Sequence, residues 1–340
     1  MQLHPYFRDH MVIPAGKPWR IYGETEGEVR VTFRGLEVCA SAVDGKFCIT
    51  VPATGAGGPF EVVITCGESC VTLRDVWSGA VLLIGGQSNM GLNVGESFPP
   101  SGGTPDREDL RIYCPVWFGT EGLLSRDKGW VVCTAENTPA WTAVGYHTGV
   151  EVARRTGLHV GIVPCYQGAA CVESFLPEEI VAKPEYQLED TWTHGDHRFP
   201  EYTWNKPGLL YHSRFLTLGP CGLSAMVWYQ GESNTGKGES EVFFAMTCEL
   251  IRKWREDLLD PELPYVEVQL ADCVPRSAKT GWHAVQHVQE RVPETVPGGT
   301  WVKSRDVCET DRIHPRDKEM LSRRIAAAML DELKIFGQKT

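Results

Sequence analysis

A serine, a histidine and an aspartate stand in sequence contexts that suit nucleophilic catalysis. Ser88 comes two residues after a glycine pair that directly follows the apolar run 81–84. His314 lies three residues after Asp311, shortly before a helical pattern near the C-terminus. A serine hydroxyl is a weak nucleophile until a base takes its proton, and a histidine oriented by a carboxylate is such a base. We therefore predict that Ser88 is a nucleophile, His314 its base and Asp311 the residue that orients His314.

Two further segments could stabilise the negative charge that develops on the substrate oxygen during ester hydrolysis. Gln230 directly follows an apolar run, and Gly168 comes shortly after another. Preorganised N–H donors stabilise such an oxyanion, and a glutamine side chain or a glycine backbone can supply them. Asn234 is a second candidate in the same turn as Gln230. Taken singly, these segments also fit ordinary turns, and Ser88 fits a helix cap.

The periodicity of apolar residues predicts two regions. Residues 1–76 carry short β-like runs separated by glycine and proline turns, typical of a small β-sandwich. In residues 77–340, apolar strand-like runs alternate with helical periodicity. The runs are 81–84, 160–163, 223–229 and 265–270, and the helical patterns fall near 144–157, 243–258 and 321–333. This alternation predicts an α/β fold, with a mainly parallel sheet covered on both faces and a site at the strand ends.

The amino-acid composition argues against some classes of binding partner. The 340 residues carry a formal net charge of -11 and no run of basic residues, which argues against a nucleic-acid partner. No apolar run reaches transmembrane length, and the first residues lack a secretory pattern. The twelve cysteines are expected to be mostly reduced thiols, which favours a cytoplasmic protein. The expected partner is therefore a small-molecule or oligosaccharide substrate, while the sequence does not indicate an oligomeric state.

Taken together, these segments resemble the sialate O-acetylesterase-like branch of the SGNH (GDSL-type) hydrolases. Residues 85–90, residues 228–234 and the Asp-x-x-His-Pro pattern at 311–315 match its hallmark blocks. Residues 168–175 look like its glycine block, with Ala169 in place of the second glycine. The resemblance implies a three-layer α/β/α SGNH hydrolase domain of the flavodoxin-like type, preceded by the β-sandwich.

The resemblance also implies an activity and a site. The activity would be a serine carboxylic-ester hydrolase that removes O-acetyl groups from sialic acid or from a hemicellulose-derived xylo- or manno-oligosaccharide. The triad would be Ser88, His314 and Asp311, and the oxyanion donors the N–H groups of Ser88 and Gly168 and the Gln230 side chain. No metal or organic cofactor is expected. Expected substrate contacts are Gln87, Asn89, Glu232, Trp192, Trp204 and Trp282, of which Trp192 and Trp204 lie in the long loop expected at 177–208.

Three alternatives are weaker. An α/β-hydrolase would need a glycine two residues after the serine, where this chain has Met90. A catalytically silent carbohydrate-binding protein on the same fold would not need the three catalytic residue types together. A metal site at His283 and His287, or at Cys66 and Cys70, would be short of ligands.

Overall fold

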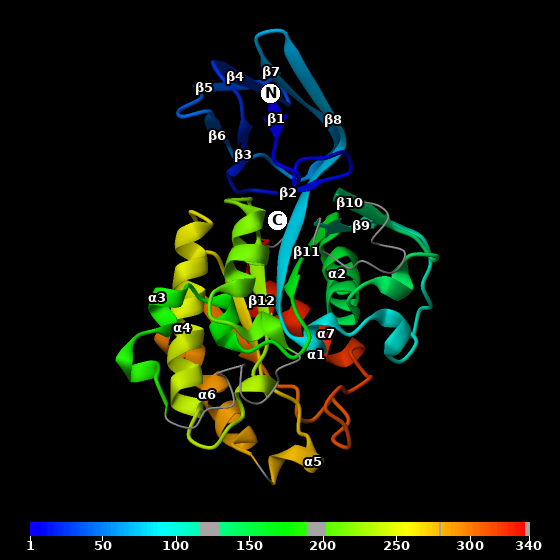
Figure 1. Ribbon diagram of the computed structural model, residues 1–340. Helices are drawn as coiled ribbons and strands as arrows, with labels where there is room; N and C mark the ends of the chain where they lie inside the picture. Colours follow the sequence, from blue (N-terminus) through cyan, green and yellow to red (C-terminus); the bar gives the residue numbers. More distant parts are fainter. Residues whose placement is uncertain (116–128, 189–201, 279, 337–340) are drawn as a thin grey trace.

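The computed structural model describes residues 1–115, 129–188, 202–278 and 280–336, and it has a β-rich end and an α/β body (Figure 1). At the β-rich end, one antiparallel sheet consists of β1 (Gln2–Leu3), β3 (Trp19–Glu24) and β6 (Lys46–Val51). A second group consists of β2 (Val12–Pro14), β4 (Glu28–Phe33), β5 (Leu36–Ser41) and β7 (Gly57–Cys66). Strands β4 and β6 alternate exposed and buried residues, as strands with one face on a core do.

Strand β8 (Ser69–Gly86) joins the two ends of the molecule (Figure 1). Its first part pairs with β7, and residues 80–86 pair with strands of the α/β body. The boundary expected between residues 76 and 77 therefore falls inside one continuous strand, and no linker separates the two regions there. The N-terminal region contains two sheets, and the second of these continues into the large sheet through β8.

The α/β body is built on a sheet with the order β10-β9-β11-β8-β12-β13-β14. Its other strands are β9 (Arg107–Cys114), β10 (Gly129–Cys133), β11 (Val160–Tyr166), β12 (Ala225–Tyr229), β13 (Tyr265–Val268) and β14 (Gly299–Val302). Neighbours from β9 to β14 are parallel, and β10 is antiparallel to β9. The prediction of an α/β fold with a mainly parallel sheet is confirmed. Within the sheet, β9, β10 and β11 lie on one side of β8, and β12, β13 and β14 lie on the other. Open α/β sheets bind ligands at such a point, where the order of the strands reverses.

Four longer helices cover this sheet, α4 and α6 on one side of β8 and α2 and α7 on the other (Figure 1). They are α2 (Ala143–Thr156), α4 (Ser240–Asp257), α6 (Trp282–Thr295) and α7 (Glu319–Ala327). Short helices are α1 (Ser88–Gly91), α3 (Glu178–Val181) and α5 (Val274–Ser277). Helix α2 ends as expected at Gly157, whose φ of 72° suits a glycine cap. Helix α7 continues as a wider π turn over Ala328–Glu332.

The remaining helical turns lie in the connections. They are Val94–Glu96, Thr138–Ala140, Val172–Phe175, Pro184–Tyr186, Thr203–Asn205, Tyr211–Phe215, Leu216–Leu218 and Glu232–Asn234. Two of these turns, Pro184–Tyr186 and Thr203–Asn205, fall together with helix α3 in the segment expected to be one long loop, which the structure describes up to residue 188 and again from residue 202.

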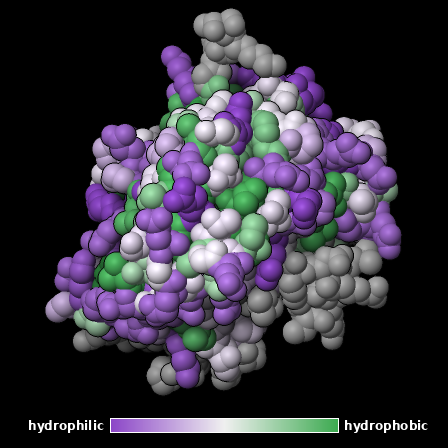
Figure 2. Space-filling model, turned by 90° about the horizontal axis from the view of Figure 1, so that it is seen from above, coloured by the Kyte–Doolittle hydropathy of each residue, from purple (hydrophilic) through white to green (hydrophobic). Residues whose placement is uncertain are grey.

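The outer surface of the β-rich end is mixed in character. Figure 2, which views the molecule from that end, shows hydrophilic side chains interspersed with small hydrophobic areas. Exposed apolar residues of this region include Leu36 and Val43. None of the twelve cysteines forms a disulfide bond. No helix among the described residues is both long enough and apolar enough to cross a lipid bilayer.

Candidate active site

Three central strands end at one level of the sheet, and the candidate residues follow directly. Gly86 of β8 is paired with Tyr166 of β11 on one side and with Tyr229 of β12 on the other. The segments that continue from these strands carry Ser88, Gly168 and Gln230. Parallel strands in register thus bring together three segments that are far apart in the sequence.

A glycine is required at the end of β8. A Cβ atom built on Gly86 would lie 2.0 Å from the carbonyl oxygen of Tyr229, and the φ of Gly86 is 140°. No side chain fits at that distance, and residues other than glycine rarely adopt this φ. The glycine before Ser88 therefore lets β8 and β12 approach closely just where the chain turns into α1.

Ser88 and His314 form the pair that the sequence analysis predicted. The Nε2 atom of His314 lies 2.7 Å from the Oγ atom of Ser88, within hydrogen-bond distance. Burial lowers the pKa of His314 below its usual 6.5, and the nearby Lys318 lowers it further. The imidazole is therefore neutral near pH 7 and able to accept the hydroxyl proton.

Asp311 is not in contact with this histidine. Its carboxylate faces the guanidinium of the adjacent Arg312 at 3.2 Å, and its side chain is 69% exposed. No hydrogen bond joins it to His314 in the described structure. The expectation that an aspartate three residues away would make this contact is not met, because the bend carries Asp311 outward, where Arg312 offers a fork-shaped partner.

Gly168 lies against Ser88. A Cβ atom on Gly168 would be 4.0 Å from the Cβ atom of Ser88. The backbone N–H groups of both residues form no hydrogen bond to any other described residue. Ala169 follows with a φ of 54°, a conformation that favours glycine. The two free N–H groups beside the hydroxyl are suited to hold an oxyanion.

Gln230 occupies a different place from the one predicted. Its side chain is fully buried, and Nε2 lies within 3.1 Å of acceptors on Gln87, Ala170 and Asn234. An amide nitrogen carries only two protons, so none remains for a substrate oxygen. The prediction of Gln230 as an oxyanion donor is therefore wrong for this structure. The Asn234 amide is likewise engaged, because it donates to Glu173.

A cavity of about 420 Å³ opens over the Ser88–His314 pair. It is lined by Gln87, Ser88, Gln167, Gly168, Ala169, Tyr202, Trp204, Glu232, Ser233, Arg276, Ile313 and His314. The predicted contacts Gln87, Glu232 and Trp204 thus lie in the cavity wall. Burial raises the pKa of Glu232 to about 6, so this carboxyl is mostly ionised at neutral pH.

Two other expected substrate contacts lie outside the cavity wall. Asn89 is buried, and its amide is bonded to Glu232, Lys318 and the carbonyl of Ile313. Trp282 is 1% exposed and donates its indole N–H to the Ala271 carbonyl, as a core tryptophan does. These two predictions are wrong. Trp192 lies outside the described residues.

Arg276 and Tyr202 are two of the cavity residues that sequence reasoning missed. Arg276 is exposed on α5, and its guanidinium forms no hydrogen bond or ion pair with a described residue. Tyr202 stands beside Trp204, with their ring centroids 5.1 Å apart. Arg276 follows the predicted strand 265–270 by six residues. Its place beyond a strand end was therefore a signal that could have marked it.

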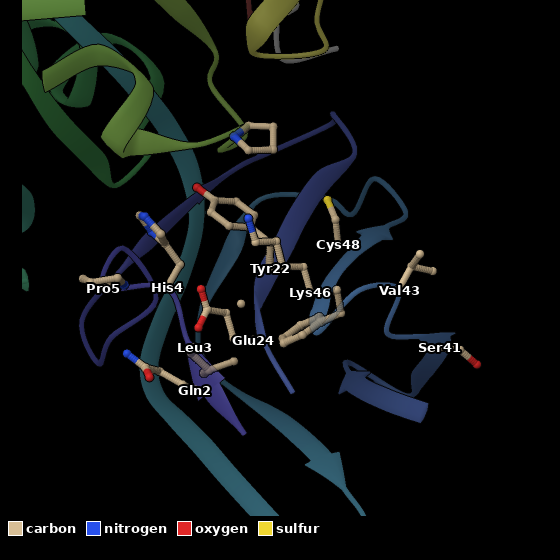
Figure 3. Close-up of a pocket in the computed structure, with 13 residues that line it drawn as sticks. Gln2, Leu3, His4, Pro5, Tyr22, Glu24, Ser41, Val43, Lys46 and Cys48 are labelled. Atoms are coloured by element: carbon tan, nitrogen blue, oxygen red, sulfur yellow. The ribbon is translucent and has the colours of Figure 1, made fainter. Parts of the chain in front are cut away.

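A larger cavity, of about 590 Å³, lies at the β-rich end and carries no comparable pair (Figure 3). His4 and Ser41 both line it, but Nδ1 of His4 accepts the backbone N–H of Tyr6, and no hydrogen bond joins the described His4 and Ser41. Glu24 and Lys46 stand opposite each other on β3 and β6. The cavity that contains a candidate catalytic pair is therefore the smaller one, over Ser88.

The described residues contain no cluster of three or more side chains suited to a metal ion. Of the histidines considered as ligands, His283 is hydrogen-bonded to Gln286, and His287 lies 4.0 Å from Glu290.

Comparison with known proteins places this site in a family context. A family model described as "Carbohydrate esterase, sialic acid-specific acetylesterase" matches residues 140–331, more than half of the chain. The sialate O-acetylesterases of mouse and human are each 25% identical over 385 and 363 residues, which cover 94% of this chain and 71% and 68% of theirs. The crystal structure of a carbohydrate acetylesterase from Xanthomonas citri matches the fold with a TM-score of 0.79, at 24% identity, over 97% of this chain and 74% of that one.

Proposed function

Because the chain belongs to the family of sialic acid-specific carbohydrate acetylesterases, a family of hydrolases, we propose that it removes O-acetyl groups from a carbohydrate through an acetyl-Ser88 intermediate. The observation that carries the proposal is the 2.7 Å contact between the Ser88 hydroxyl and the His314 imidazole, at the floor of a cavity large enough for a sugar. This geometry is that of an activated serine nucleophile.

In the proposed reaction, the Oγ atom of Ser88 attacks the acetyl carbonyl carbon while Nε2 of His314 takes its proton. The N–H groups of Ser88 and Gly168 hold the resulting oxyanion. When the tetrahedral intermediate collapses, His314 returns the proton to the leaving sugar oxygen, and the acetyl group stays on Ser88. Water then attacks the acetyl-enzyme with His314 again as base, which releases acetate and restores the serine.

The test is the substitution Ser88→Ala in the full chain. We expect it to lower the rate of acetate release from p-nitrophenyl acetate by at least about 10⁴-fold, while the unfolding temperature stays close to that of the unmodified chain. A chain that hydrolyses no acetylated sugar, yet binds one equally well with or without the substitution, would instead be a catalytically silent carbohydrate-binding protein.

The residues around the cavity favour an acidic sugar as the substrate. Tyr202 and Trp204 supply aromatic surface of the kind on which sugar rings pack. Arg276 supplies a cation that no described acidic residue pairs with, and a guanidinium binds a carboxylate with two parallel hydrogen bonds. We infer that an O-acetylated sialic acid is a better substrate than a neutral xylo- or manno-oligosaccharide.

Arg276→Gln tests this choice. We expect KM for an O-acetylated sialoside to rise at least about tenfold, because a hydrogen bond to a charged group contributes about 1.5–3 kcal/mol, while hydrolysis of p-nitrophenyl acetate is unchanged. Acetylated xylo-oligosaccharides provide the matched neutral substrate. A preference for the neutral substrates, unaffected by Arg276→Gln, would assign the enzyme to hemicellulose fragments instead.

A further inference from the structure

A buried chain of hydrogen bonds with charged groups at both ends lies behind the Ser88 hydroxyl. The Nζ atom of Lys318 donates to Oδ1 of Asn89 at 2.8 Å. The Nδ2 atom of Asn89 donates to Oε1 of Glu232 and, at 2.8 Å, to the carbonyl oxygen of Ile313. A lysine can only donate, so its contact fixes which end of the amide carries the protons. Both protons of the Asn89 amide therefore have a partner.

This chain of bonds connects the segments that form the candidate active site. Asn89 directly follows Ser88, and Ile313 directly precedes His314. The hydrogen bond to the Ile313 carbonyl ties the peptide group shared by Ile313 and His314 to the residue after the nucleophile. That peptide group is planar and stiff. The orientation of this peptide group therefore helps to fix the position of the His314 Cα atom, from which the imidazole side chain extends.

The environment makes these contacts strong. Lys318, Asn89 and Glu232 are 1%, 2% and 4% exposed, and hydrogen bonds to charged groups are about twice as strong as neutral ones. Burial lowers the pKa of Lys318 to about 8 and raises that of Glu232 to about 6. At pH 7 the lysine is therefore mostly protonated and the carboxyl mostly ionised, so the amide lies between a cation and an anion that both polarise it.

We propose that Lys318 is a positioning residue for His314. Through Asn89 it holds the peptide before the histidine against the Ser88 turn, and it thereby supplies the orientation that Asp311, exposed beside Arg312, does not supply in this structure. The proposal rests on the esterase function proposed above. Lys318 does not touch the substrate, so its effect reaches the reaction only through the placement and charge environment of the imidazole.

The test compares Lys318→Met with Lys303→Met in the full chain. Lys303 is exposed, and its side chain forms no hydrogen bond or ion pair with a described residue, so its replacement should change neither rate nor stability. For Lys318→Met we expect kcat for p-nitrophenyl acetate to fall about 10- to 100-fold with KM changed less than twofold, because small misplacements of reacting groups have effects of that size.

The pH–rate profile separates positioning from plain fold stabilisation. Lys318 and Arg276 lower the pKa of His314, and Glu96 raises it. Loss of the lysine charge should therefore move the acid limb of kcat to higher pH. A purely structural role predicts a lower unfolding temperature but an unchanged kcat and acid limb for the folded protein, and that result would overturn the proposal.

A second variant covers the case in which Lys318→Met does not fold. Lys318→Gln keeps an N–H donor for Asn89 without the charge, so we expect it to retain kcat within about fivefold while its acid limb still moves to higher pH. A kcat and acid limb like those of the unmodified chain in this variant would also contradict the proposal. If Ser88→Ala keeps full activity, the esterase function itself fails; if only the Lys318 variants behave as the unmodified chain does, only the positioning role fails.

Discussion

The nucleophile turn and the histidine segment are held in different ways. Ser88 follows a strand that is paired on both sides, and at Gly86 the backbone lies so close to Tyr229 that no side chain would fit. His314 lies in a segment of bends between residues 309 and 316, outside any helix or strand. Side chains hold it, through Asn89 and Lys318 and through the Glu309 carboxylate, which accepts two backbone N–H groups, together with two isolated backbone hydrogen bonds at Thr310 and Arg316. A continuous backbone ladder fixes one partner of the pair, whereas polar side-chain contacts and isolated backbone bonds fix the other.

The largest expected effect comes from a substitution at the end of β8, next to the turn that carries Ser88. Gly86→Ala places a Cβ atom against the Tyr229 carbonyl and imposes an unfavourable φ. We expect the free energy of unfolding to fall by about 3 kcal/mol or more, as overpacking and backbone strain add. Urea unfolding measures this change. Gly102→Ala is the matched control, because its Cβ meets nothing within 4 Å; equal effects of the two substitutions would contradict the argument.

The acid limb of the activity profile reports on the histidine segment. His314 must be neutral to act as a base, and its burial holds its pKa below 6.5. We expect kcat/KM to stay level near neutral pH and to fall about tenfold per pH unit once the pH drops below that pKa. Stopped assays across pH 4–8, with circular dichroism to confirm folding at each pH, measure the midpoint. A midpoint above 6.5 would show that the imidazole lies in a more anionic setting than this structure has.

A smaller effect is expected from Asp311→Asn. Removing the aspartate of a working triad lowers kcat by about 10⁴-fold. Since Asp311 contacts Arg312 rather than His314, we expect a loss of less than about tenfold in kcat/KM. Asp331→Asn, which removes an exposed partner of Arg155, serves as the control for loss of a surface charge. A loss near 10⁴-fold would restore Asp311 as the residue that orients His314 during turnover.

The smallest effect concerns the end of β11. Ala169 adopts a φ of 54°, so Ala169→Gly should relieve strain and raise the free energy of unfolding by less than about 1 kcal/mol, because the added freedom of the unfolded glycine offsets part of the gain. Ala278 has an ordinary helical φ of -72°, so Ala278→Gly should lower stability instead. Thermal unfolding measures whether each substitution raises or lowers the stability. A loss of stability in both variants would contradict the strain argument.

Much of the fold was predictable because it depends on local patterns. The apolar runs that became β8, β11, β12 and β13 were found from their composition, and Gly157 marked the end of α2. Strand β9 was missed because its first residues are charged and only its later part is buried. Strand β10 and strand β14 are short and lie at the ends of the main sheet, where the signal from burial is weak.

The site divides in the same way. The sequence by itself was enough to predict that Ser88, Gly168 and His314 belong to one site, because the segments that carry them, although each alone also fits an ordinary turn or cap, together fit one ester-hydrolysis site. The tertiary structure alone decided which polar groups remain free at that site. Gln230 and Asn89 carry suitable amides, but buried neighbours use all their protons, whereas the Arg276 guanidinium forms no hydrogen bond or ion pair with a described residue. Hydrogen-bonding capacity is set by residue type, but whether it is already satisfied depends on neighbours that only the folded chain brings together.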